Sequence, residues 1–193
     1  MSKRDEYIQH LSQQDHITEN HLQQFREKIS GEDFEKSLDT PYDLKLFNCA
    51  EEYRKSAQYL IKKPENYHQA IYMEHVRAYV LCLSFSLELY VKCLLIIKNK
   101  NSHGHEITKL FKKLNGKTRA ELSHLYGIRT TNKSLNEEEF ILVLSKVNNI
   151  FVEWRYVYEN DYSGFIDIQT IWHTINCFRE HILRIKNNDK LTT

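Results

Sequence analysis

The chain has 193 residues, enough for one domain with a sizeable single core. Five glycines and two prolines are too few for the many turns of a β-rich fold, so the composition favours an all-α fold. A net charge of +1 gives no global field that attracts nucleic acid, so any RNA contact must come from a local patch.

Residues 1–40 are polar and weakly patterned, and we interpret them as an N-terminal helical arm. Thr40-Pro41 supplies an N-cap and a proline at the first helical position, so we expect a helical bundle over residues 41–193. The first helix of that bundle ends before Pro64. A second long helix then runs from about Tyr67 to Lys98.

Two short helices are expected next, from His105 to Leu114 and from Arg119 to Tyr126. Asn115-Gly116 stops the first of them, and Gly127 stops the second. A short helical crossover of this kind is typical of bundles whose long helices run up and down.

The spacing Ser134-x-x-Glu137 matches a capping box and opens another long helix. Its apolar residues fall on one face from Phe140 to Tyr158, and Ser163-Gly164 then breaks the helix. The last helix repeats this pattern from Ile168 to Ile185. The sequence therefore predicts an all-α, up-and-down bundle of long helices with a short helical crossover.

The second long helix reaches nearly membrane-spanning length, but two charges near its middle favour a buried helix of a soluble protein. No apolar stretch follows the basic N-terminus, so no secretory signal is expected. Because of the two charges in the second long helix, we expect no membrane partner. The cysteines form no Cys-x-x-Cys pair and several have apolar neighbours, which favours reduced core thiols in a cytoplasmic protein. They are Cys49, Cys82, Cys93 and Cys177.

A narrow polar stripe interrupts the apolar surface of the second long helix. Within it, Glu88 and Lys92 form an i,i+4 pair with the acid first, the more favourable orientation. Two interpretations stay open: a solvated edge of a central helix, or the wall of a polar groove in which Glu88 holds a cation or an arginine. The stripe consists of Glu74, Arg77, Ser84, Glu88 and Lys92.

Arg155 lies close to the apolar face of its predicted helix. An arginine is costly to desolvate without a partner, so it either snorkels or pairs with Glu159, or it serves a site. The polar side chains of Asn160 and Tyr162 follow at the end of this helix. Since Glu88 and Arg155 would each be costly without a partner, we predict that they lie in the same polar groove, in contact directly or through a water molecule.

Three segments together resemble the HEPN superfamily, helical-bundle proteins of bacterial defence, toxin–antitoxin and RNA-processing systems. They are Leu87–Leu95, Gly104–Ile107 with Leu110 and Leu114, and Trp154-Arg155-Tyr156. The resemblance covers roughly residues 42–187. Active HEPN ribonucleases carry an arginine, four variable residues and a histidine, and one toxin branch has a tyrosine two places further. In this chain Arg155 matches the arginine and Tyr162 the tyrosine, while Asn160 stands at the histidine position.

The resemblance implies metal-independent RNA cleavage, in which the 2′-hydroxyl attacks the adjacent phosphate. Such a reaction needs a base for the hydroxyl proton and a cation for the phosphorane charge. Arg155 can be the cation, but Asn160 cannot exchange a proton near neutral pH. Either another residue is the base, with His173 on the last helix as a candidate, or the site binds without cutting. His173 is otherwise an ordinary exposed histidine.

The histidine pairs His103/His105 and His68/His75 lack the four ligands of a structural zinc site, so we expect neither metal nor cofactor. By the resemblance, His105 has a structural place near the start of a short helix.

We predict an HEPN-like RNA- or nucleotide-handling protein of prokaryotic (antiviral) defence or toxin–antitoxin type, and we favour a binding-type site over an active endoribonuclease. The resemblance implies a homodimer whose two arginine motifs form one cleft, and a partner such as a nucleotidyltransferase antitoxin. The alternative is a non-enzymatic helical interaction module that docks a partner protein. The predicted site residues are Arg155, Asn160 and Tyr162 for catalysis, and Glu88, Lys92, Glu159 and His173 for an RNA-binding groove.

Overall fold

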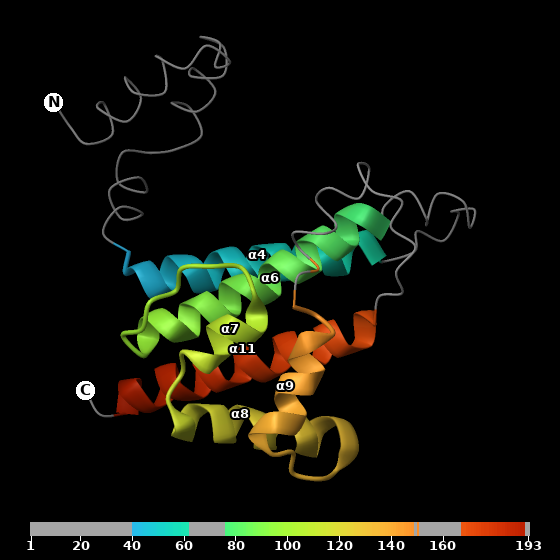
Figure 1. Cartoon of the computed structure of the whole chain (residues 1–193). Coiled ribbons are helices and arrows are strands. Elements are labelled where there is room, and N and C mark those ends of the chain that lie inside the picture. Colours follow the sequence, from blue (N-terminus) through green and yellow to red (C-terminus); the bar gives the residue numbers. More distant parts are fainter. Residues whose placement is uncertain (1–39, 62–75, 149, 151–166, 192–193) are drawn as a thin grey trace, which may run out of the picture. The chain divides into compact units, whose positions relative to one another are not determined.

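The structure is a computed structural model that describes residues 40–61, 76–148, 150 and 167–191. These residues form six α-helices and no β-strand (Figure 1), which confirms the predicted all-α bundle. The chain divides into two compact units, Met1–Pro41 and Tyr42–Thr193, and the six helices belong to the second. They are α4 (Tyr42–Ile61), α6 (Val76–Ile97), α7 (Ile107–Lys112), α8 (Gly116–Thr131), α9 (Glu137–Ser145) and α11 (Ile168–Leu191).

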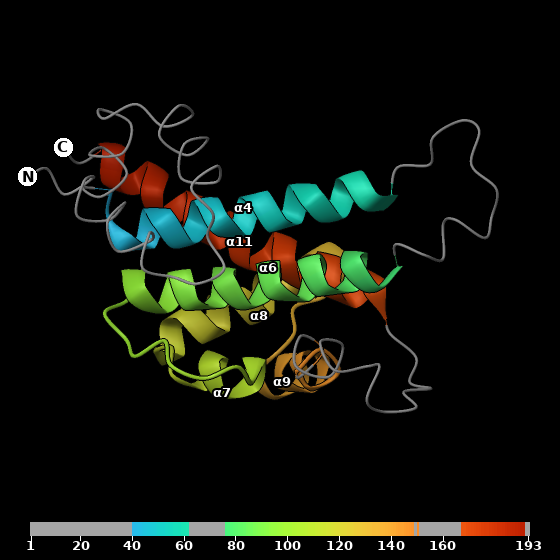
Figure 2. The same ribbon diagram turned by 90° about the horizontal axis from the view of Figure 1, so that it is seen from above.

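The central helix is α6, and both α4 and α11 pack against it. The six consecutive residues from Ser86 to Val91 are all buried, and six residues cover more than a full helical turn. This middle part of the helix is therefore enclosed on every side. Ala50 and Ala57 of α4 are fully buried, and these small residues suit the close approach of α4 to α6 that Figures 1 and 2 show.

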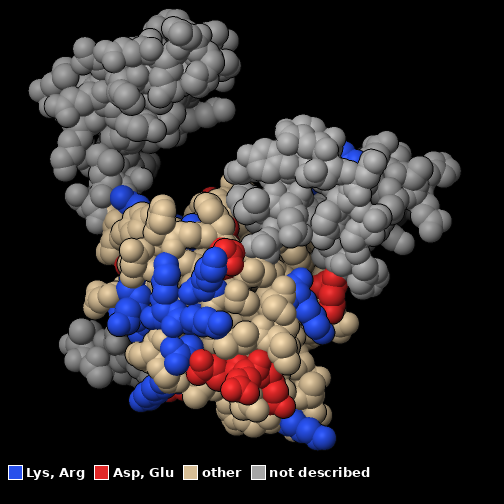
Figure 3. Space-filling view, in the orientation of Figure 1, with Lys and Arg blue, Asp and Glu red and all other residues tan. Residues whose placement is uncertain are grey.

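The shorter helices cover the rest of the core. α7 packs on α6 and α9, and α8 packs on α9 and α11. The apolar face predicted for the last helix is confirmed, because Ile171, Ile175, Phe178 and Ile182 of α11 are fully buried. Charged side chains are spread unevenly over the surface of the bundle (Figure 3).

By length and composition, α6 is the one helix among the described residues that is able to cross a membrane. However, 67% of its most apolar 18-residue window is buried inside the bundle. Such burial is typical of the core helix of a soluble protein.

The prediction that Gly127 ends a helix is wrong. α8 begins earlier than expected, at Gly116, and continues through Gly127 to Thr131. A Cβ atom at Gly127 would lie 2.3 Å from the Lys133 carbonyl oxygen and 2.5 Å from the Leu135 amide nitrogen. Glycine is therefore required because the chain after α8 passes directly over this position, and the spacing of residues along the sequence does not reveal that contact.

The predicted capping box is displaced by two residues. The N-cap of α9 is Asn136, whose Oδ1 accepts a hydrogen bond from the Glu139 amide at 2.9 Å. The Glu139 carboxylate accepts one from the Asn136 amide at 2.8 Å. Ser134 instead places its Oγ 3.0 Å from Nδ1 of His124. Both residue pairs have the spacing of a capping box, so the pattern alone does not choose between them.

The sequence predicted one long helix from this cap onward, and that prediction is wrong. α9 ends at Ser145 and is followed by a turn over 146–148. The side chain of Asn148 in that turn accepts hydrogen bonds from the Thr108 amide and hydroxyl, both at 2.9 Å. The chain is thus diverted to hold the first turn of α7. The predicted arm over 1–40 and the predicted helical continuation from 151 to Ser163-Gly164 lie outside the described residues, as does the first turn expected near Tyr67.

The tight passage at Gly127 predicts that Gly127→Ala destabilises the bundle by about 1–3 kcal/mol, because the added methyl group meets backbone atoms that cannot move freely. Gly116→Ala is the matched control, since a Cβ there meets no atom within 4 Å. Urea unfolding followed by circular dichroism measures both. Equal free energies of unfolding for the two variants would contradict the explanation.

Candidate functional site

The structure describes three of the seven predicted site residues: Glu88 and Lys92 on α6, and His173 on α11. The residues of the arginine motif lie outside the described residues, so their geometry stays a prediction. They are Arg155, Glu159, Asn160 and Tyr162.

Glu88 is a buried carboxylate in the middle of α6, with only 1% of its side chain exposed. Its Oε1 lies 2.7 Å from Nζ of Lys92 and 2.9 Å from Nδ1 of His105, which belongs to the loop before α7. Ser84 of the same stripe is also buried, and its hydroxyl donates to the Val80 carbonyl oxygen at 2.8 Å. The stripe is therefore not a solvated edge at Glu88 and Ser84.

The contact with Glu88 involves Nδ1 of His105. An ionised carboxylate only accepts hydrogen bonds, so with Glu88 in that form Nδ1–H is the donor. The His105 side chain is 59% exposed, so the contact links the buried carboxylate to a residue at the surface.

His173 is partly exposed in the second turn of α11. Its neighbour Trp172 points its ring nitrogen at the Tyr79 hydroxyl, 2.7 Å away, and so ties α11 to α6. Within the described residues, no hydrogen bond or ion pair joins His173 to Glu88 or to His105. A shared groove of His173 with the arginine motif stays a prediction.

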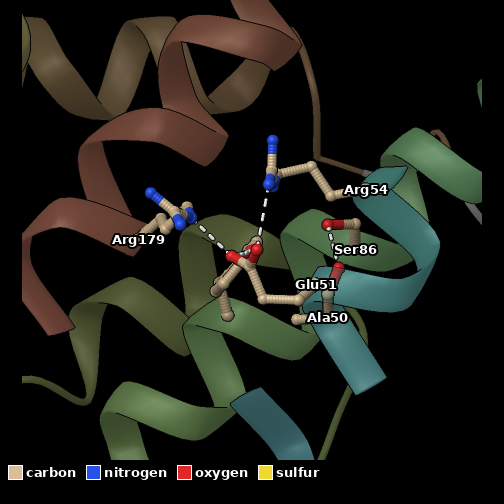
Figure 4. Close-up of polar contacts among 6 residues, drawn as sticks. Ala50, Glu51, Arg54, Ser86 and Arg179 are labelled. Atoms are coloured by element: carbon tan, nitrogen blue, oxygen red, sulfur yellow. Dashed lines mark hydrogen bonds and ion pairs between the residues drawn. The ribbon is translucent and has the colours of Figure 1, made fainter. Parts of the chain in front are cut away.

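A second carboxylate, that of the partly buried Glu51 of α4, was not predicted from the sequence. Its Oε2 accepts a hydrogen bond from Nη2 of Arg54 at 2.9 Å. Its Oε1 accepts hydrogen bonds from the Tyr90 hydroxyl of α6 and from Nε of Arg179 of α11. Figure 4 shows both arginines reaching Glu51, beside the 2.9 Å hydrogen bond from the Ser86 hydroxyl to the Ala50 carbonyl oxygen.

The protonation states indicate that this cluster has a structural role and not a catalytic one. Burial by itself raises the pKa of Glu51, but hydrogen bonds from Arg54, Arg179 and Tyr90 outweigh it and lower the pKa to about 2. Burial and the nearby Glu51 raise the pKa of Tyr90. At neutral pH the carboxylate is thus ionised and the phenol neutral, and neither is poised to exchange protons.

A signal for this cluster was present in the sequence. Glu51 and Arg54 follow Phe47 at i+4 and i+7, so they continue the apolar face of α4. Charges on an apolar helix face need partners when that face is buried.

Nucleophilic cysteine chemistry and a metal centre receive no support. Burial raises the pKa of Cys93 and of Cys177 to about 12, so both stay protonated thiols near neutral pH. The prediction of core thiols is confirmed for these two residues. In the described ranges, no three His, Cys, Asp or Glu side chains are grouped so that they could hold a metal ion.

Comparison of the chain with protein-family models, curated proteins and solved structures finds no match. The chain is therefore an all-α helical bundle that carries two carboxylate clusters, and evidence for its function comes from its own residues.

The Glu88 cluster predicts that Glu88→Ala lowers the free energy of unfolding by about 2–4 kcal/mol, because Lys92 and His105 lose a buried partner. Glu106→Ala is the matched control, since Glu106 pairs with Lys109 at the exposed surface and should change stability little. Urea unfolding of the wild type and both variants measures these changes in the free energy of unfolding. A loss for Glu88→Ala no larger than the control would show that the buried contact does not stabilise the fold.

The Glu51 cluster predicts a dependence of stability on pH. Because the pKa of Glu51 is lower in the folded state than its ordinary value of 4.5, its contribution is complete above about pH 5 and is lost as the pH falls towards 2. Glu51→Gln should therefore cost about 1–3 kcal/mol near neutral pH and much less at pH 2.5. Unfolding curves across this range test the prediction, and a constant difference between the two proteins would refute it.

Proposed function

We propose that the chain is an HEPN-like RNA- or nucleotide-handling protein of a prokaryotic defence or toxin–antitoxin system, acting in the cytoplasm. The observation that carries the proposal is the contact between Glu88 and His105, which are 17 residues apart in sequence. It joins the Leu-Glu-Leu-Tyr-Val-Lys segment of α6 to the Gly-His-Glu-Ile segment before α7. Two of the three segments that carry the resemblance are thus held together by their own polar residues.

The third segment supplies the proposed site. Arg155 would bind phosphate and stabilise negative charge on it, and Asn160 would orient a phosphate oxygen or a water molecule. We further propose a homodimer in which two such motifs form one cleft, with a nucleotidyltransferase as a candidate antitoxin partner. The absence of a proton-exchanging group at Asn160 favours binding over cleavage.

The structure removes the argument for pairing Glu88 with Arg155. The pairing was expected because each charge would be costly without a partner. Glu88 already has Lys92 and His105 as partners, so its burial needs no arginine. We therefore place Arg155 in the proposed RNA site without assigning Glu88 to the same groove.

Cleavage and binding of a labelled RNA by four proteins test the proposal: the wild type, Arg155→Ala, Asn160→His and Arg77→Ala. Arg155→Ala should abolish any cleavage and weaken binding, whereas the exposed Arg77 of α6 is a matched control that should change neither. If the wild type cleaves, Asn160→His should raise the rate by up to about 10²–10⁴-fold, because it restores an acid–base group.

The outcomes separate the candidates. Arg155-dependent binding without cleavage supports a binding-type site. A fast wild type that Asn160→His slows would place the base elsewhere, with His173→Ala as the next variant. If no protein binds or cleaves RNA, the proposal fails and the interaction module that docks a partner protein takes its place.

A further inference from the structure

Charge is strongly segregated along this nearly neutral chain. Residues 98–120 hold seven of the 27 cationic residues and one of the 26 acidic ones, a local net charge of +6. The rest of the chain, with 20 cationic and 25 acidic residues, has a net charge of −5. The cationic residues are Lys98, Lys100, Lys109, Lys112, Lys113, Lys117 and Arg119, and we call the surface that they form the basic surface.

Contacts within the segment make the basic surface continuous. Nζ of Lys113 donates to the His103 carbonyl oxygen at 2.6 Å, which holds the loop of residues 98–106 against α7. Nη1 of Arg119 donates to the Leu114 carbonyl oxygen at 2.6 Å, which holds the first turn of α8 against the end of α7. Figure 3 shows Lys and Arg side chains gathered over this region, beside a group of acidic side chains where α9 begins.

The neighbouring acids neutralise only part of the basic surface. Glu137 pairs with Arg119 at 2.8 Å, and Glu106 pairs with Lys109. Within the described part of the chain, the exposed Lys100, Lys112 and Lys117 have no acidic partner. The cationic charge of these three lysines is therefore available to an anionic ligand.

The exposed chemistry indicates how such a ligand would be held. Phe111 is the one Phe, Tyr or Trp in residues 98–120, and it is fully buried. The basic surface thus offers charge and hydrogen-bond donors but no aromatic side chain on which a base can stack. Ligands of this kind are recognised through their phosphates and not through their sequence.

We propose that the basic surface binds the phosphodiester backbone of nucleic acid, without base specificity. This site deepens the proposed RNA handling, but it is separate from Arg155 and does not depend on cleavage. It accounts for how a protein with a net charge of only +1 attracts a polyanion: the positive field is concentrated on one surface.

The double variant Lys112→Gln/Lys117→Gln tests the site, with a fluorescently labelled 20-nucleotide RNA and a DNA of the same sequence. Affinity for RNA should fall about tenfold at 150 mM salt, and the slope of log K against log salt should decrease by about 0.7 for each lysine. DNA should bind within a few-fold of RNA. The matched control is Lys55→Gln/Arg77→Gln, which removes two exposed charges, one on α4 and one in the first turn of α6, and should leave affinity unchanged.

Circular dichroism of both double variants confirms that they are folded. An equal loss of affinity in the control, or a polyglutamate peptide that binds as tightly as RNA, would overturn the site. Unchanged RNA affinity in Lys112→Gln/Lys117→Gln would also overturn it, and Arg155-dependent binding would then still support the proposed function. Conversely, RNA binding that is retained by Arg155→Ala and lost by Lys112→Gln/Lys117→Gln supports binding at the basic surface, even if the proposed Arg155 motif has no role.

Discussion

The middle of α6 is buried on every side, so its polar side chains need partners, because an unpaired buried polar group costs more than most contacts contribute. Ser84 finds its partner within α6, but three other polar side chains find theirs in neighbouring elements. Each partner comes from a different part of the bundle. The Ser86 hydroxyl donates to α4, Glu88 accepts from the loop before α7, and the Tyr79 hydroxyl meets Trp172 of α11. The apolar surface of α6 drives association, and these polar contacts determine where each neighbour sits along it.

Glu51 extends the same constraint to three helices at one point. Its carboxylate lies on α4 and accepts hydrogen bonds from Tyr90 of α6 and Arg179 of α11. Sliding any one of these helices by a turn would leave a carboxylate or an arginine partly buried without a partner. The cluster therefore specifies the register of the bundle more than it adds to stability. A second contact of this kind, between Asp43 and Lys186 at 3.1 Å, joins α4 and α11 near the other end of α4.

Apolar periodicity predicted the helices well, because the spacing of apolar residues within a helix determines which of its faces is buried. The buried face of α11 from Ile171 to Ile182 illustrates this. Helix ends were harder to predict, because contacts with other parts of the chain determine them. Asn148 lies in the turn after α9 and binds the first turn of α7, and glycine is required at position 127 because a later segment crosses it. For the candidate site, spacing marked Glu88 as unusual but did not identify His105 as its partner. Contacts between distant residues require the fold itself.

The bundle treats its internal and its surface charges differently, and this contrast indicates where ligands bind. The carboxylates of the partly buried Glu51 and the buried Glu88 have their hydrogen-bond donors within the chain, so a ligand has little to gain there. Lys112 and Lys117 are exposed and lack such partners among the described residues. Surface charges of one sign repel one another and weaken the fold slightly, unless an anion offsets them. A gathering of cationic residues in a chain whose remainder is acidic is therefore better explained by a polyanionic ligand than by the needs of the fold.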